Sequence, residues 1–254
     1  PVIPPVVVPN DRVKLALETG SAANLTEQDR QTLINLALNT AKQQQNWQKK
    51  LLTALYSNTN NQPLQPYLQF TPNASINIYP TDLSTALPIA VSDKNCNWAL
   101  TLQNNKGCGL GVASKIGNGR ALAYGQNMFN GVLNSNPDFT QFTEVLNNSL
   151  RWLITGDTKQ AVNKVLNVSV QGMPADQVKR YLEQQLGTTV TFPECNALDP
   201  KNACWQDLDL IVISSNIANQ TFEKELIEKY LKAGKAVYFQ ANTYGVNSNI
   251  DKVL

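Results

Sequence analysis

The second half of the chain alternates short, apolar, β-prone runs with amphipathic segments, and this alternation constrains the fold most. Strands are predicted at Val165–Val170, Thr188–Phe192, Leu208–Ser214 and Ala236–Gln240. Helices are predicted at Pro174–Leu186 and Thr221–Lys232, with Gly187 and Gly234 at the expected C-cap positions. Such alternation predicts a largely parallel sheet covered on both faces. We therefore expect a flavodoxin-like or Rossmann-like three-layer α/β fold.

The preceding segment adds a β-hairpin region and one helix to this pattern. Further strands are predicted at Leu87–Val91, Trp98–Leu102, Leu110–Ile116 and Arg120–Tyr124. The link Gly117-Asn118-Gly119 predicts a hairpin turn, because Gly and Asn tolerate positive φ. A helix is predicted over Phe139–Ile154, with apolar residues on one side and Gly156 as its stop.

The N-terminal part reads as a linker and a small helical unit. Residues 1–10 are rich in Pro and Val and predict an extended linker, whereas Trp47–Tyr56 repeats apolar positions at helical spacing. Thr26 and Asp29 have the spacing of a capping box. We divide the chain into a linker (1–10), a helical unit (11–80) and an α/β domain (81–254). Since it has no initial Met or signal peptide, we interpret it as a fragment of a longer protein. No apolar run reaches the roughly 18–20 residues that cross a bilayer.

The chain of 254 residues contains no histidine, which excludes many enzyme classes. Ser-His-Asp and Cys-His triads, and the two-histidine zinc helix, all need an imidazole. We therefore expect no metal site and no cofactor. The net charge of +2 favours neither nucleic acid nor an anionic membrane as a partner.

Four cysteines form two closely spaced pairs, Cys96 with Cys108 and Cys195 with Cys204. We predict two local disulfides, each stabilising by roughly 2–3 kcal/mol in the chain-entropy model. Such bonds persist in an oxidising compartment, which indicates the periplasm or the cell surface. Four reduced cytosolic thiols are the alternative.

Two short patterns have a catalytic and a structural interpretation. The run Gly107–Gly111 resembles a dinucleotide-binding loop, but it leads into a predicted strand rather than a helix, which favours a loop beside a disulfide. Asp207 and Asp209 could form a glycosidase pair. They lie at the entrance of a predicted strand, whereas ligands in such folds bind beyond the carboxyl ends. We therefore expect Asp207 and Asp209 to increase solubility or to cap the strand rather than to catalyse a reaction.

Uncharged hydrogen-bonding residues follow the predicted strands at the carboxyl edge of the sheet. Their chemistry suits sugar hydroxyls or a peptide backbone, although polar loops that merely cap a sheet are the alternative. The ligand-binding candidates are Gln126, Asn127, Gln171, Ser214, Ser215, Asn216, Gln240, Asn242 and Tyr244.

Four stretches carry a family resemblance: Gly117–Phe129, Phe139–Gly156, Asp207–Ile213 and Tyr230–Val237. Together they resemble the non-catalytic, class I glutamine-amidotransferase-like region of large bacterial surface metalloproteases. The relatives are the accessory colonization factor type lipoproteins and the immunomodulating metalloproteases with an M60-like domain. The resemblance covers about residues 85–254. It implies that the zinc-binding HExxH helix lies in a separate C-terminal domain. At the amidotransferase nucleophile position this chain has Ser214-Ser215 instead of Cys, which argues against that activity.

These observations favour a non-catalytic module of a secreted or lipid-anchored surface metalloprotease or adhesin with a role in virulence. We expect it to bind host glycoproteins or extracellular matrix and to contact downstream domains of the same chain. The alternatives are a structural scaffold for a downstream zinc peptidase domain and a carboxylate-dependent glycoside hydrolase.

Overall fold

The computed structural model describes residues 10–14, 25–29, 31–32, 47–58, 60–64, 85–92, 108–135, 139, 142–197, 199, 201, 203–214 and 224–240. Its contacts divide the chain into two compact units, Pro1–Lys50 and Leu51–Leu254. The domain boundaries at residues 10 and 80 stay predictions.

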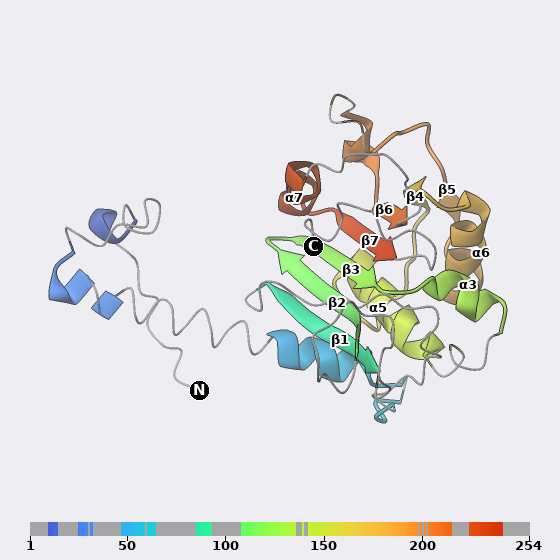
Figure 1. Cartoon of the computed structure of the whole chain (residues 1–254), viewed down its shortest axis with the longest axis horizontal. Helices are drawn as coiled ribbons and strands as arrows, with labels where there is room; N and C mark the ends of the chain where they lie inside the picture. Colours follow the sequence, from blue (N-terminus) through green and yellow to red (C-terminus); the bar gives the residue numbers. More distant parts are fainter. Residues whose placement is uncertain are drawn as a thin grey trace. The chain divides into compact units, whose positions relative to one another are not determined.

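Within the described residues, seven strands of the second unit form one mixed sheet (Figure 1). The strands are β1 (Ala86–Ser92), β2 (Cys108–Ile116), β3 (Gly119–Tyr124), β4 (Leu166–Gln171), β5 (Val190–Thr191), β6 (Leu210–Ser214) and β7 (Ala236–Gln240). Their order is β1-β2-β3-β7-β6-β4-β5, antiparallel from β1 to β3 and parallel from β3 to β5. Strands β5, β4, β6 and β7 follow the first four positions of the flavodoxin-like order 2-1-3-4-5. The fifth position is occupied by β3, which precedes the other four in the chain.

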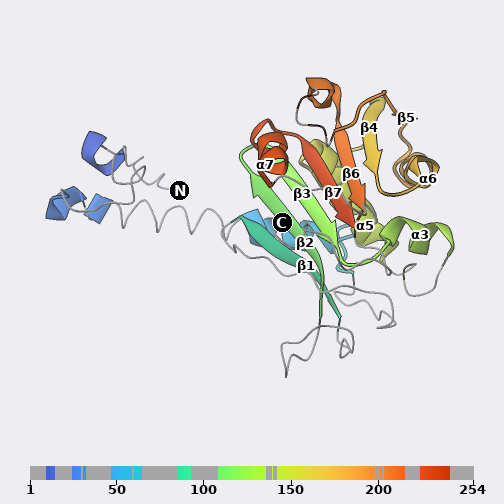
Figure 2. The same cartoon turned by 45° about the horizontal axis from the view of Figure 1, so that its top comes forward.

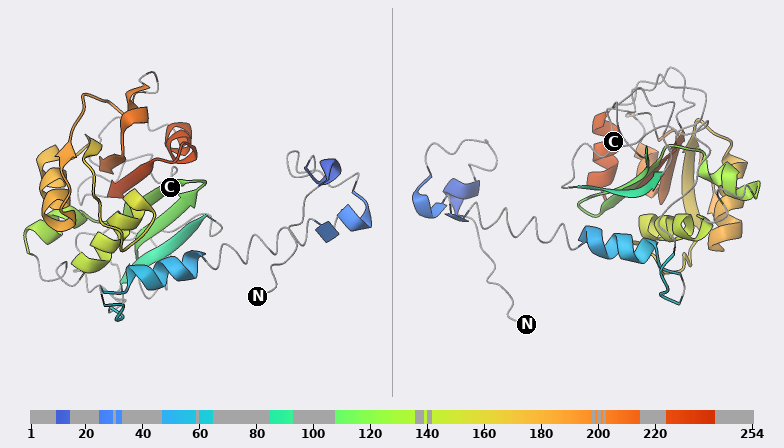
Figure 3. Two further views of the ribbon diagram at one scale, coloured as in Figure 1. Left: turned by 180° about the vertical axis from the view of Figure 1, so that it is seen from behind. Right: turned by 60° about the horizontal axis from the view of Figure 1, so that its bottom comes forward.

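Helices cover both faces of this sheet, as predicted. Helices α5 (Thr143–Thr155) and α6 (Ala175–Leu186) lie on one face, and α7 (Lys224–Lys232) lies on the other (Figures 2 and 3). Gly156, Gly187 and Gly234 follow the three helices with positive φ, which confirms them as C-caps. The three-layer α/β prediction is confirmed.

The two faces differ in how they are packed. Even-numbered strand residues such as Tyr124 and Tyr238 point toward α5 and α6, where Phe129 stacks on Tyr238 with ring centroids 4.6 Å apart. Burial raises the pKa of Tyr124 and Tyr238, so both stay neutral. Odd-numbered residues such as Ile211 and Phe239 pack with α7 and with Trp205. Successive strand residues alternate between the faces because a strand has a side-chain period of two.

The segment 51–64 packs on the α/β domain through polar contacts. Its helix ends at residue 55 beside α5, where the Asn148 amide donates to the carbonyls of Leu55 (2.9 Å) and Ser57 (3.0 Å) (Figure 3). The Tyr56 hydroxyl donates to the carbonyl of Ile89 in β1 (2.6 Å). Next to Ile89 lies Pro88, and the β1–β2 register shifts after it. The helix predicted over Trp47–Tyr56 is confirmed for residues 47–55.

The first unit contains the predicted capping box. The Asp29 amide donates to Thr26 Oγ1 (3.2 Å), and Asp29 Oδ2 accepts from the Thr26 amide (3.0 Å). Asp29 also accepts from the side-chain nitrogen (Nδ2) of Asn10 (2.6 Å) and pairs with Arg12 (3.0 Å). The hydrogen bonds from Asn10 and Thr26, together with Arg12, lower the pKa of Asp29 to about 2.

Several predicted boundaries were wrong. The helix predicted over Phe139–Ile154 does not continue through Phe142: Phe139 is helical, but α5 begins at Thr143, with Phe142 as its N-cap. Strand β5 has two residues, and the helices α3 (Met128–Leu133) and η2 (Ala203–Asp207) were not predicted. The predicted strand Trp98–Leu102 lies outside the described residues.

Candidate functional site

Four parallel strands end side by side and carry three of the predicted binding residues. In the β3–β7–β6 register, Tyr124 pairs with Gln240, and Gln240 pairs with Ser214. Gln171 ends the neighbouring strand β4, opposite Ile213 (Figure 2). The predicted carboxyl edge therefore exists as one continuous row of strand ends.

Gln240 and Ser214 share a face of the sheet, whereas Gln171 lies on the opposite face. Gln240 and Ser214 are a register pair in parallel strands, so their side chains point to the same side, toward α5 and α6. Gln171 pairs with Ile213, which packs in the α7 layer. The structure thus brings two candidates together and separates the third.

Gln240 and Ser214 are both deeply buried, with 0% and 1% of their surface exposed. The Gln240 carboxamide accepts from the Tyr238 hydroxyl (3.3 Å) and donates to the Met173 thioether (3.3 Å). A thioether is a weak acceptor. Among the residues that the structure describes, Ser214 Oγ has no hydrogen-bond partner.

Gln126 and Asn127 follow β3 at the same edge. Gln126 is buried, and Asn127 is the N-cap of α3, where its side chain accepts from the Asn130 amide (3.0 Å). This hydrogen bond is the usual interaction of an N-cap side chain and orders the start of α3. The candidates Ser215, Asn216, Asn242 and Tyr244 lie outside the described residues.

On the other face, Gln171 is connected to a disulfide. Its side-chain amide donates to Ser169 Oγ (3.2 Å), which donates to the carbonyl of Cys195 (3.1 Å). Cys195 is bonded to Cys204, with Cα atoms 5.6 Å apart, so this predicted disulfide is confirmed. The predicted Cys96–Cys108 bond involves Cys96, which lies outside the described residues.

The disulfide closes the segment that connects β5 to β6. Trp205 packs on Tyr230 of α7, with ring centroids 4.9 Å apart, and the Tyr230 hydroxyl donates to the carbonyl of Ala197. Where a flavodoxin-like fold places a crossover helix, this connection has η2 as its only helix among the described residues.

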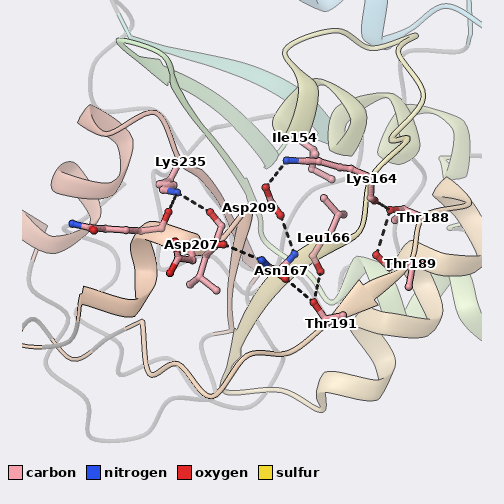
Figure 4. Close-up of polar contacts among 12 residues, drawn as sticks. Ile154, Lys164, Leu166, Asn167, Thr188, Thr189, Thr191, Asp207, Asp209 and Lys235 are labelled. Carbon is pink, nitrogen blue, oxygen red and sulfur yellow. Dashed lines mark hydrogen bonds and ion pairs between the residues drawn. The ribbon is translucent and has the colours of Figure 1, made fainter.

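Asp207 and Asp209 lie at the opposite, amino edge (Figure 4). Asp209 accepts from the Asn167 amide of β4 (2.9 Å) and pairs with Lys164. The carbonyl of Asp207 accepts from the Asn167 side chain (3.2 Å). This agrees with the capping role that we predicted.

From Cys108 onward the glycine-rich run lies in strand β2, so the prediction of a loop was wrong for these residues. Gly111 lies opposite Tyr124 in the β2–β3 pair, and a Cβ at Gly111 would come within 2.8 Å of the Tyr124 ring. Gly111 is thus explained by packing. The strand runs into the β2–β3 hairpin rather than into a helix, so the geometry of a dinucleotide loop is missing here.

Sequence reasoning missed Met173, Gln177 and Asn130 beside this edge. The Gln177 amide, in the first turn of α6, donates to Asn130 Oδ1 of α3 (2.9 Å). Pro174 signalled the start of α6, but α3 has only six residues and no long periodic pattern to reveal it. Within the described ranges, no group of three His, Cys, Asp or Glu residues could hold a metal ion, and no helix is long and apolar enough to span a membrane.

A comparison with protein families assigns most of this chain. Residues 37–254 match the family described as the immunomodulating metalloprotease N-terminal domain. The chain belongs to this family. The match confirms the predicted relationship to these metalloproteases, and it assigns this chain to their N-terminal domain, which is a separate accessory domain. The amidotransferase-like detail of the fold stays a prediction.

Solved structures of IMPa share the fold of this N-terminal domain. IMPa from Pseudomonas aeruginosa in complex with an O-glycopeptide has 23% identity and a TM-score of 0.68, over 94% of this chain and 24% of that one. The IMPa metallopeptidase from P. aeruginosa has 24% identity and a TM-score of 0.67, over 96% and 24%. IMPa metallopeptidase in complex with T-antigen has the same identity and TM-score, over 96% and 25%. The chain thus spans about a quarter of each. A comparison with curated protein sequences finds no significant match.

Proposed function

We propose that this domain positions its parent metalloprotease on host glycoproteins or extracellular matrix, without catalysing a reaction itself. The observation that carries the proposal is the pairing of Ser214 and Gln240, two uncharged hydrogen-bonding groups, at the carboxyl edge of a parallel sheet. Open α/β sheets bind ligands outside this edge. Serine and carboxamide groups both donate and accept, as sugar hydroxyls do.

Two further observations support a glycoprotein partner. Two of the three solved relatives described above are in complex with a glycan ligand, one with an O-glycopeptide and one with T-antigen. The Cys195–Cys204 disulfide fits an oxidising compartment, where such partners occur. We extend the proposal accordingly to a secreted or cell-surface parent protein, lipid-anchored in its full length, that acts as an adhesin in virulence.

A scaffold for a downstream zinc peptidase domain is the second candidate. The burial of Gln240 and Ser214 favours it, because buried polar groups also serve to fix a fold. A carboxylate-dependent glycoside hydrolase has less support, since Asp209 is occupied by Lys164 and the Asn167 amide.

Binding of the 254-residue chain to an O-glycopeptide, mucin, fibronectin, fibrinogen and collagen tests the proposal. We expect saturable binding to at least one glycoprotein, and its loss after enzymatic removal of the O-glycans. The variant Gln240→Met, which keeps the volume and removes the carboxamide, should weaken it. Thr191→Val removes an exposed polar group in β5, away from the Ser214–Gln240 pair; it is the control and should bind like the parent chain.

The scaffold function predicts a different pattern. None of the five ligands would bind, and deletion of the domain from the parent protein would reduce folding or secretion rather than attachment. That pair of results would refute the glycoprotein proposal.

A further inference from the structure

The direction of the chain reverses between β4 and β6. From β4 the chain continues to β5 at the edge of the sheet, whereas from β6 it continues to β7, on the side away from β4. In an open parallel sheet, such a reversal leaves a crevice beyond the carboxyl ends of the two strands, because the two connections leave in opposite directions. Ser214 ends β6 at this reversal.

The neighbours of Ser214 at this corner are a carboxamide on one side and a residue without a side chain on the other. Gln240 lies beside it on β7. Directly after β4, Gly172 follows the Gln171–Ile213 pair by one residue, has a φ of +78°, and has no side chain. Met173, the acceptor of the Gln240 amide, leads into α6. The corner is therefore bounded by Gln240, Ser214, Gly172 and Met173.

Two buried side-chain atoms lack a hydrogen-bond partner among the described residues, and one of them lies at this corner. They are Ser214 Oγ, at the end of β6, and Gln177 Oε1, in the first turn of α6. Buried polar atoms in proteins are nearly always paired, so an unpaired one indicates a missing water, ion or ligand group. The unpaired hydroxyl lies at the position where the topology places a ligand.

The charges at the corner favour a neutral ligand. Ser214 and Gln240 are uncharged, and the first turn of α6, which follows Met173, already has the acidic residue Asp176 to complement the helix dipole. An anion at this helix end would meet that carboxylate. A sugar hydroxyl can accept a hydrogen bond from Ser214 Oγ or donate one to it.

We propose that this corner is a subsite for one hydroxyl group of a neutral saccharide, bound by Ser214 Oγ. The inference rests on the proposed function, since it names the residue through which the domain would hold a glycan. The ligand reaches the corner from beyond the strand ends, and its hydroxyl replaces the weak thioether contact of Gln240 with a stronger partner.

The test compares two buried serines by thermal unfolding, with and without T-antigen glycan. Ser149 of α5 is fully buried and has partners, since it donates to the Val145 carbonyl (2.7 Å) and accepts from Tyr124 (3.1 Å). Without glycan, Ser149→Ala should lower the Tm because these bonds are lost, whereas Ser214→Ala should leave it unchanged or higher. With glycan, the parent chain and Ser149→Ala should be stabilised, and Ser214→Ala should not. The Kd of Ser214→Ala should rise by about tenfold, as for the loss of one hydrogen bond.

Each other outcome overturns the inference. Glycan binding by Ser214→Ala at the affinity of the parent chain would place the subsite elsewhere and leave the proposed function standing. If the parent chain binds none of the glycans or glycoproteins, both proposals fail. Stabilisation by inorganic phosphate but not by the glycan would contradict the neutral ligand class.

Discussion

Removal of the Cys195–Cys204 disulfide should destabilise the domain and expose one face of its sheet. The two residues are nine positions apart. For a closed loop of this size, the chain-entropy model gives about 2.7 kcal/mol of lost stability at 25 °C. If the connection also detaches, the hydrogen bonds to the carbonyls of Cys195 and Ala197 are lost as well, at about 1 kcal/mol each. The total expected loss is then about 5 kcal/mol.

The double variant Cys195→Ala/Cys204→Ala provides the assay, because it leaves the other two cysteines intact. With a urea m-value of about 3 kcal/mol/M for a chain of this size, the midpoint should fall by about 0.9 M or more. Hydrogen exchange should quicken at residues 195–208 and in α7, which pack together, and stay slow in α5 and α6. A midpoint within about 0.2 M of the parent chain would refute the reasoning, and so would equal acceleration in all helices.

Three other changes test the packing. Gly119→Ala should cost about 1–3 kcal/mol because its Cβ would overlap the Leu231 carbonyl, whereas Gly117→Ala has open space and should cost only about 1 kcal/mol for its positive φ; equal losses in urea unfolding would contradict this. Asn148→Ala removes the hydrogen bonds to the carbonyls of Leu55 and Ser57, so it should cost about 1–3 kcal/mol of stability and speed proteolysis near residues 55–58. Unchanged proteolysis would show that these two bonds do not hold the segment on α5. Burial raises the pKa of Tyr230 from 10.0 to about 12, so the folded state holds the phenol proton more tightly than the unfolded state does. The stability that this difference contributes should be complete below pH 10 and fall as the pH rises toward 12. Urea unfolding at several pH values should show a smaller fall for Tyr230→Phe.

The parts of the fold that could be predicted depend on local sequence. The run Ala236–Gln240 was predicted with both ends correct, because four apolar or aromatic residues and then Gln240 come shortly after a glycine that ends the preceding helix. The hairpin at Gly117-Asn118 was equally local. The six-residue helix α3 has no such pattern, and only its cap, Asn127, gave a signal.

The arrangement of the strands could not be predicted in this way. The pairing of β3 with β7 joins segments that are distant in the sequence. The alternation of residues in each strand predicts a strand but does not determine which strand lies beside it. The same limit applies to the site. Ser214, Gln171 and Gln240 were predicted at one edge because each ends a strand, but the face each side chain takes depends on register.

The outermost strand, β1, is poorly suited to pairing with a strand of another molecule. A sheet grows when an incoming strand finds backbone donors and acceptors that are still available. In β1, Pro88 has no amide proton to offer, the neighbouring carbonyl of Ile89 already accepts from Tyr56, and the pairing with β2 is irregular at the same place. Strand addition from a neighbouring domain or a second copy is therefore disfavoured at this end of the sheet, which guards the chain against edge-to-edge aggregation.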